Sequence, residues 1–385
     1  MKIHQNEVAS NLLIILVWIN LVVLFDNSLF KFYETHFKFF YLIIIVIVFF
    51  IINIKISIKK AAIFLILVLY FGITVTAKGM GFDSTITIIS SVLSVYCFSR
   101  FSINYKKMVW LFRGYFVLYL FAFFNSFTYY HRWQMYSMRE WINPNTYGMF
   151  IFYASVFFDM YIRIRAKKYI KTKQVVLYLG SIFILWQYES RTMLAVFLIY
   201  LIISRIILNQ KFREQIKKKI MILLGSIIIL GTAFPFVYCK LADYLYSINF
   251  SNYFMGKDVF TRYAVWKQFL DYLQGHGEEL LFGFGLNGLE TSVASVHNNY
   301  LIIIGYGGIV GIVLYYLFVL YVTRERVNSI TFQYEFCYLL GFILIFLIGF
   351  TEVSSFWLPL YPIQFILIGK IEISRSEVIE TVDYR

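Results

Sequence analysis

The sequence predicts an all-α polytopic membrane protein with about twelve transmembrane helices. Of its 385 residues, 60% are hydrophobic, and the mean hydropathy is +0.71. A soluble domain of this size could not hide that much apolar surface from water. The apolar residues also form long runs, many of about 18 residues or more, which suffice for a helix to cross a bilayer core of roughly 30 Å.

Polar breaks divide the apolar runs into twelve predicted spans. They cover residues 11–25, 38–54, 61–77, 83–98, 108–128, 146–162, 175–188, 192–208, 220–238, 297–321, 334–350 and 356–371. The first span is about as long as the apolar part of a signal peptide. The Asp26-Asn27-Ser28 sequence after it offers no small-residue cleavage site, so we expect this helix to be retained. We expect residues 1–385 to form one integral-membrane domain.

The distribution of Lys and Arg predicts the orientation in the membrane. With the N-terminus in the cytoplasm, 24 of the 35 basic residues lie on the inner side and 10 on the outer side, and Arg113 lies inside the fifth span. Such an inner excess is typical of membrane proteins, so we predict that both termini are cytoplasmic. The same basic loops explain the net charge of +14, and no nucleic-acid partner is expected.

The longest predicted connection is an extracytoplasmic loop, residues 239–296. Long loops are usually functional or disordered, and this one is not of low complexity. Apolar residues recur within it at helical spacing, which predicts a helix in the membrane interface or over the bundle. They are Val259, Tyr263, Trp266, Leu270 and Leu273. Asp258 precedes them as the predicted N-cap.

Within this loop, GFGLNG (residues 283–288) matches the G-x-G-x-x-G fingerprint of dinucleotide-binding folds. It follows no predicted strand and belongs to no βαβ unit, which that fold requires. We therefore predict that the glycines form a tight turn that returns the chain to the membrane. The sequence has no Asp-x-Asp pair, no His/Cys cluster and no P-loop, so neither a metal nor a cofactor is expected.

His297 and Asn298 lie at the outer end of the tenth span. Nine residues separate Asn298 from Gly308, and two more separate Gly308 from Gly311. This H-N-x9-G-x-x-G pattern resembles the signature of the O-antigen ligase and polymerase superfamily of bacterial integral-membrane enzymes. Four further elements resemble that family's pattern in the same order. They are Asn143-Pro144-Asn145, Glu189-Ser190-Arg191-Thr192, Arg262 with Trp266, and Leu281-Phe282-Gly283-Phe284-Gly285.

The resemblance implies a GT-C-like membrane glycosyltransferase in the bacterial cytoplasmic membrane, with its site at the outer face and no need for a metal. The implied donor is an undecaprenyl-pyrophosphate-linked oligosaccharide. Membrane lipids, a chain-length regulator and a flippase are the other expected partners.

Glycosyl transfer from a lipid pyrophosphate needs cations for the developing phosphate charge and a partner for the acceptor hydroxyl. Arginine binds phosphate bidentately and keeps its charge, and an imidazole exchanges protons near neutral pH. The catalytic candidates are therefore Arg191, Arg262 and His297. The candidate substrate-binding residues are Asn298, Asn143, Asn145 and Arg139. Glu352, at an outer helix end, is expected to be solvated.

The first expected function is a polymerase that joins lipid-linked repeat units of a capsule or O-antigen. Two alternatives stay open: a ligase that transfers a finished glycan to its final acceptor, and a flippase for the lipid-linked oligosaccharide. The outer loop is compact beside those of many ligases. A flippase should carry cations within a central cavity, whereas Arg113 is the one clear cation inside a predicted span.

Overall fold

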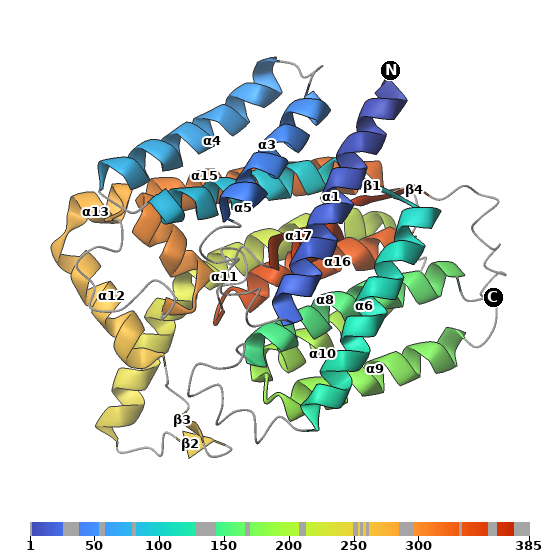
Figure 1. Cartoon of the computed structure of the whole chain (residues 1–385). Helices are drawn as coiled ribbons and strands as arrows, with labels where there is room; N and C mark the ends of the chain where they lie inside the picture. Colours follow the sequence, from blue (N-terminus) through green and yellow to red (C-terminus); the bar gives the residue numbers. More distant parts are fainter. Residues whose placement is uncertain are drawn as a thin grey trace.

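The computed structural model describes residues 2–25, 38–53, 58–78, 82–127, 144–165, 170–207, 213–248, 253–254, 257–258, 262–284, 296–330, 333–352 and 360–372. Within these ranges the chain forms fourteen α-helices (Figure 1). The first eight are α1 (Lys2–Phe25), α3 (Lys38–Asn53), α4 (Ile58–Ala77), α5 (Phe82–Ser99), α6 (Tyr105–Ser126), α8 (Pro144–Arg165), α9 (Ile170–Gln187) and α10 (Arg191–Ile207). The remaining six are α11 (Arg213–Ser247), α12 (Tyr263–Gly275), α13 (Gly277–Phe282), α15 (Asn299–Ser329), α16 (Gln333–Ile348) and α17 (Tyr361–Phe365).

The prediction of a helical protein is confirmed, with two very small sheets added to it. β1 (Ser102–Asn104) pairs in parallel with β4 (Lys370–Glu372), and β2 (Tyr253–Phe254) pairs antiparallel with β3 (Lys257–Asp258). Such short strands leave no periodic apolar pattern in the sequence, which explains why the sequence did not indicate them.

Several helices are long and apolar enough to cross a membrane. Four helical stretches meet this requirement outright: Glu7–Leu24, Lys106–Ser126, Lys219–Ser247 and Asn299–Ser329. Shorter apolar helices cover Lys38–Ile52, Leu65–Ala77, Thr85–Ser99 and Tyr334–Ile348. Their outward faces carry large apolar side chains such as Phe50, Ile73 and Leu230, each more than 60% exposed. This apolar exterior is the surface expected of a multi-pass membrane protein.

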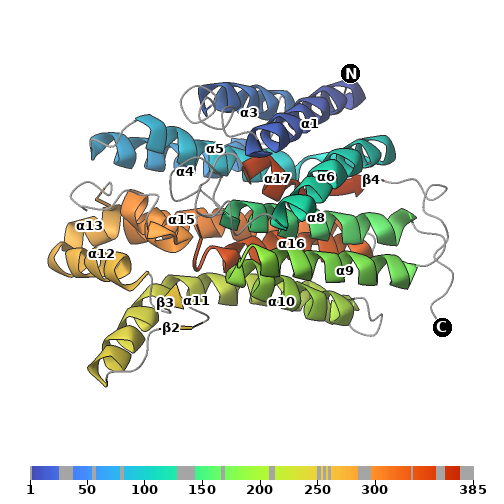
Figure 2. The ribbon, with the colours of Figure 1, turned by 60° about the horizontal axis from the view of Figure 1, so that its bottom comes forward.

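The molecule is elongated, with α12 and α13 near one end and β4 toward the other (Figure 2), and α1 and α6 run at a wide angle to α15 (Figure 1). One continuous core of buried apolar side chains includes residues from Ala9 to Ile371. Within it, α15 is the most deeply buried of the four stretches of membrane-crossing length. It packs against α4, α5, α11 and α13, and so connects the N-terminal helices with the segment that contains α12 and α13.

The twelfth predicted span, 356–371, does not form one continuous helix. In its described part, the five-residue α17 is followed by a 3-10 turn (Ile366–Ile368) and then by β4. Pro362 fits the first turn of α17, because the missing N–H of a proline is not needed there. After Gly369 the chain becomes extended and pairs with β1. The eight residues of α-helix and 3-10 turn, Tyr361–Ile368, are too short to cross a bilayer core alone.

The predicted outer loop contains more regular structure than its sequence indicated. The helix expected to end at residue 238 continues as α11 to Ser247, with Pro235 inside it. The predicted amphipathic helix is confirmed as α12, and its Trp266, Leu270 and Leu273 are buried. Asp258 is not its N-cap, because Asp258 lies in β3 and Arg262 occupies the cap position. Val259 lies outside the described residues.

α15 is broken at Gly308, whose φ of 61° and ψ of −160° are not helical. The end of α13 lies against this break, so that a Cβ on Gly308 would be 2.2 Å from the Leu281 carbonyl oxygen. Gly283, with φ of 83°, also lies against this backbone: its added Cβ would be 2.8 Å from the Gly305 carbonyl oxygen, to which Phe284 N–H donates at 3.0 Å. The first glycine of GFGLNG therefore serves a close approach of two backbones, a position that only glycine fills without strain.

Candidate functional site

The carboxylate of Glu352 collects three side chains that the sequence places far apart. Asn145 donates its Nδ2–H to Oε1 at 2.9 Å, and Arg262 Nη2 lies 3.3 Å from the same oxygen. His297 Nδ1 lies 3.4 Å from Oε2. Glu352 itself is buried in the turn after α16. A buried carboxylate is energetically costly without partners, so these three side chains explain why Glu352 can be buried at this position.

The backbone around His297 is held on both sides. Asn298 caps α15 through a 2.8 Å bond from Leu301 N–H to its Oδ1, while its Nδ2 donates to the Phe350 carbonyl at 2.7 Å. Asn299 N–H donates to the Gly349 carbonyl at 2.9 Å. These bonds fix the start of α15 to the turn that carries Glu352. His297 has a φ of 44°, a left-handed conformation that is unusual for a residue other than glycine.

α12 explains the spacing of the R-x3-W element. Arg262 at its start reaches Glu352, and Trp266, one turn later, donates from Nε1 to the Val296 carbonyl at 2.6 Å. Residues four apart lie on one face of a helix. One face of α12 therefore contacts both the Glu352 carboxylate and Val296, the residue before His297. Lys267 anchors α12 to α11 through Asp243 at 3.2 Å, and this hydrogen bond raises the pKa of Lys267.

Arg191 begins α10 at the same end of the molecule. The next residue, Thr192, shares a 2.8 Å hydrogen bond with Thr351, the neighbour of Glu352. The Arg191 side chain is exposed and makes no ion pair with the described part of the chain. Glu189, two residues earlier, has a φ of 51°, and its carbonyl accepts from Arg191 N–H at 2.9 Å. This strained turn sets where α10 begins.

The predicted site residues therefore divide into three groups. Asn145, Arg262 and His297 converge on one carboxylate, and Arg191 lies on an adjoining helix end. Asn298 is fully buried with both ends of its amide bound to backbone, so the structure gives it a positioning role beside His297. Its predicted contact with substrate, like that of the others, stays a prediction. Asn143 and Arg139 lie outside the described residues.

Glu352 is the residue that the sequence interpretation missed. It was expected to be solvated, and that expectation is wrong, because its side chain is only 8% exposed. The sequence carries no clear signal for this burial, because an acidic residue at a helix end usually faces water. Its counter-charge, Arg262, comes from a distant segment.

The Glu352 cluster contains one guanidinium, an imidazole and a side-chain amide around its carboxylate, and the exposed Arg191 guanidinium lies on the adjoining helix end. These groups are hydrogen-bond donors for phosphate and carbohydrate oxygens. Among the described residues, no three His, Cys, Asp or Glu side chains gather closely enough to hold a metal ion.

No family model, curated protein or solved structure matches this chain. Its fold defines the class of helical proteins with several membrane-length apolar helices, and the Glu352 cluster lies at one end of the bundle.

Proposed function

We propose that this chain is a polysaccharide polymerase of the cytoplasmic membrane, which joins undecaprenyl-pyrophosphate-linked repeat units of a capsule or O-antigen at the outer face. The observation that carries the proposal is the convergence of Asn145, Arg262 and His297 on Glu352. These residues come from three elements that were singled out by resemblance to the O-antigen ligase and polymerase superfamily, and residues of one site should lie together.

The proposed reaction moves a growing glycan from one lipid carrier to another. The acceptor hydroxyl oxygen bonds to the anomeric carbon of the donor glycan, and the bond from that carbon to the pyrophosphate oxygen breaks. The pyrophosphate leaves on its lipid with an added negative charge, while the hydroxyl proton passes to a base. No metal or cofactor takes part in the proposed reaction.

Each residue has a proposed role in that reaction. Arg191, which has no ion-pair partner among the described residues, binds the pyrophosphate, and Arg262 adds a second positive charge. His297 accepts the hydroxyl proton at Nε2, which has no partner in the described ranges. Glu352 lies beside the other ring nitrogen and stabilises the imidazolium that forms, as a buried carboxylate does in other His–carboxylate pairs.

In the proposed orientation the chain passes through the membrane twelve times, the last time as a segment that is not one continuous helix, and both termini are cytoplasmic. This orientation follows from the distribution of Lys and Arg, and it puts the Glu352 cluster at the outer face. The flippase alternative has less support from the geometry, because the exposed Arg113 side chain lies 5.9 Å over the Trp110 ring on α6 instead of in a central cavity.

The test is the profile of lipid-linked glycans in cells that make the wild-type chain, no chain, or His297→Ala. A polymerase leaves single repeat units on lipid outside the cytoplasm when it is lost, and the wild-type chain restores a ladder. A normal ladder that stays on the carrier would instead indicate a ligase. Units trapped on the cytoplasmic side would indicate a flippase, and a normal profile with His297→Ala would exclude the proposed role of that histidine.

A further inference from the structure

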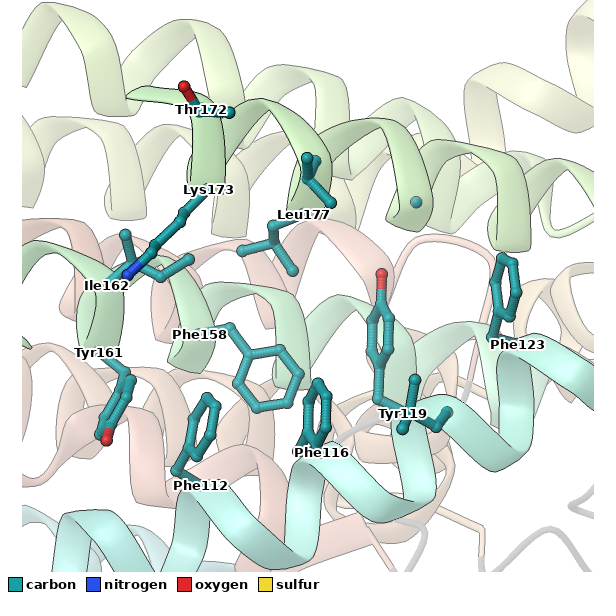
Figure 3. A pocket seen from close by; sticks show the side chains of 13 residues that line it. Phe112, Phe116, Tyr119, Phe123, Phe158, Tyr161, Ile162, Thr172, Lys173 and Leu177 are labelled. Atoms are coloured by element: carbon teal, nitrogen blue, oxygen red, sulfur yellow. The ribbon is translucent and has the colours of Figure 1, made fainter. Parts of the chain in front are cut away.

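A groove of about 610 Å³ lies between α6, α8 and α9, away from the Glu352 cluster (Figure 3). Its volume falls within the range of roughly 300–1,000 Å³ that small-ligand sites occupy. The walls are aromatic and aliphatic: Phe112 and Phe116 from α6, Phe158 and Tyr161 from α8, and Val176 and Leu177 from α9. Phe112 stacks on Tyr161 with ring centroids 4.1 Å apart, so two of the lining rings support each other.

The groove opens on the outward surface of the helices. Val176 is 66% exposed and Phe116 is 43% exposed. On a membrane protein such a surface faces lipid, so an elongated apolar chain can enter the groove from the side.

The two ends of the groove differ. At one end, Lys173 extends toward Ile162, whereas the Thr172 hydroxyl points away from the Lys173 ammonium (Figure 3). The Lys173 ammonium makes no ion pair with the described residues. At the other end, Tyr119 bonds to Ser181 at 2.8 Å, and Phe123 packs on Phe183 with ring centroids 5.9 Å apart. Tyr119 and Phe123 line the end of the groove that lies toward Glu352.

The position of Lys173 indicates which leaflet the groove serves. Lys173 lies in the first turn of α9, at the end that the basic residues assign to the cytoplasm. From Lys173 to Gly180, the groove follows α9 for about 10 Å, at 1.5 Å per residue. This length fits within one leaflet, which is about half of a 30 Å core.

We propose that this groove binds one acyl chain of an anionic phospholipid from the cytoplasmic leaflet, with the lipid phosphate at Lys173. The proposal goes beyond glycosyl transfer and rests on the proposed orientation alone. A cation without an ion-pair partner among the described residues, at the headgroup level, complements an anionic phosphate. The aromatic end of the groove, with no cation among its lining residues, suits the acyl chain.

The test uses phosphatidylglycerol with a diazirine in one acyl chain, mixed into phosphatidylcholine vesicles that hold the full chain. Illumination should label residues of α6 and α9 that line the groove. Lys173→Gln should lower this labelling about tenfold, because it removes the charge-assisted contact with the bound lipid phosphate, to which Lys171 does not contribute. Lys171→Gln, an exposed lysine outside the groove, should not change it.

A second pair of variants tests the groove itself. Val176→Trp should fill the groove and remove the label, whereas Val175→Trp, on a neighbouring exposed face, should keep it. Equal labelling by the matching phosphatidylcholine probe would overturn the proposal. So would labelling no stronger than that of other exposed faces such as Phe50, or stronger labelling by a diazirine-bearing polyprenyl phosphate. A failure of the glycan-ladder test would leave these results unaffected.

Discussion

Asn145 and Arg262 donate to the same oxygen of Glu352, at 2.9 and 3.3 Å. Asn145 belongs to the first turn of α8, and Arg262 caps α12, so one carboxylate joins two helices to the turn after α16. The opposite oxygen faces His297. Loss of the Glu352 charge should therefore disturb three candidate site residues at once.

Glu352→Gln should reduce polymer formation by roughly 10- to 100-fold, because a hydrogen bond to a charged group contributes about 1.5–3 kcal/mol. The amide keeps the size and one acceptor oxygen, so the protein should still fold. The measurement is the rate of ladder formation in membranes supplied with lipid-linked repeat units. Glu278→Gln, which removes an exposed carboxylate from α13, is the matched control and should keep the wild-type rate. A wild-type rate for Glu352→Gln would contradict the proposed role.

Arg191→Ala should abolish ladder formation without loss of stability. Its side chain is exposed and forms no ion pair with the described residues, and exposed substitutions usually change the free energy of unfolding by within about 0.5 kcal/mol. The checks are ladder formation and the thermal unfolding midpoint of the purified protein. Lys240→Ala removes another exposed charge at the same end of the bundle and should affect neither. A fall in both readouts for Arg191→Ala would indicate a structural role instead.

Much of the fold could be predicted because the length of each apolar run is visible directly in the local sequence. Eleven of the twelve predicted spans correspond to helices in the described residues. The segment around Pro362 could not be predicted in the same way, since its apolar content resembles that of a helix while its pairing with Ser102–Asn104 is a tertiary contact. Local hydropathy contains no information about such a pairing.

The cationic residues of the candidate site could be predicted from the sequence, whereas the carboxylate of Glu352 at its centre could not. Arg262 and His297 stand out because few charged residues occur on the predicted outer side. Glu352 did not, because an acidic residue at a helix end usually faces water. Its burial depends on Asn145 and Arg262 reaching the same place from other segments, which only the folded arrangement reveals.

Gly308→Ala should destabilise the protein strongly or prevent its folding. A Cβ there would lie 2.2 Å from the Leu281 carbonyl oxygen, and the φ of 61° is itself unfavourable for alanine. The measurement is the yield and the thermal unfolding midpoint of the purified protein. Gly225→Ala is the control: nothing lies within 4 Å of its added Cβ, so the change should stabilise α11 by about 0.5–1 kcal/mol. Equal midpoints for the two variants would mean that the break in α15 is not fixed by α13.

Cysteine labelling should show opposite ends of the bundle on opposite sides of the membrane. The native Cys97, Cys239 and Cys337 are buried, so the background should be low. We expect a membrane-impermeant maleimide to label Glu278→Cys in intact spheroplasts and to label Arg324→Cys only after lysis. Both positions are exposed, which makes them a matched pair. The reverse pattern would invert the proposed orientation and remove the Glu352 cluster from the outer face.

Asp159→Asn should test how α8, α9 and α10 are held together. The fully buried Asp159 carboxylate accepts from Gln174 at 2.8 Å, Tyr178 at 2.6 Å and Tyr200 at 2.8 Å, and it pairs with Arg163 at 3.0 Å. Breaking such a buried pair costs about 3–5 kcal/mol, because the remaining cation loses its counter-charge. The thermal unfolding midpoint should fall accordingly.

Two further variants separate the ion pair from the hydrogen bonds. Tyr200→Phe removes a single donor and should cost only about 1 kcal/mol. In the double variant Asp159→Asn with Arg163→Gln, no unpaired cation is left, so its midpoint should lie above that of Asp159→Asn alone. If the two losses simply add, the Arg163 guanidinium is not what makes the loss of Asp159 costly, and the three hydrogen bonds from Gln174, Tyr178 and Tyr200 would account for the packing of these helices.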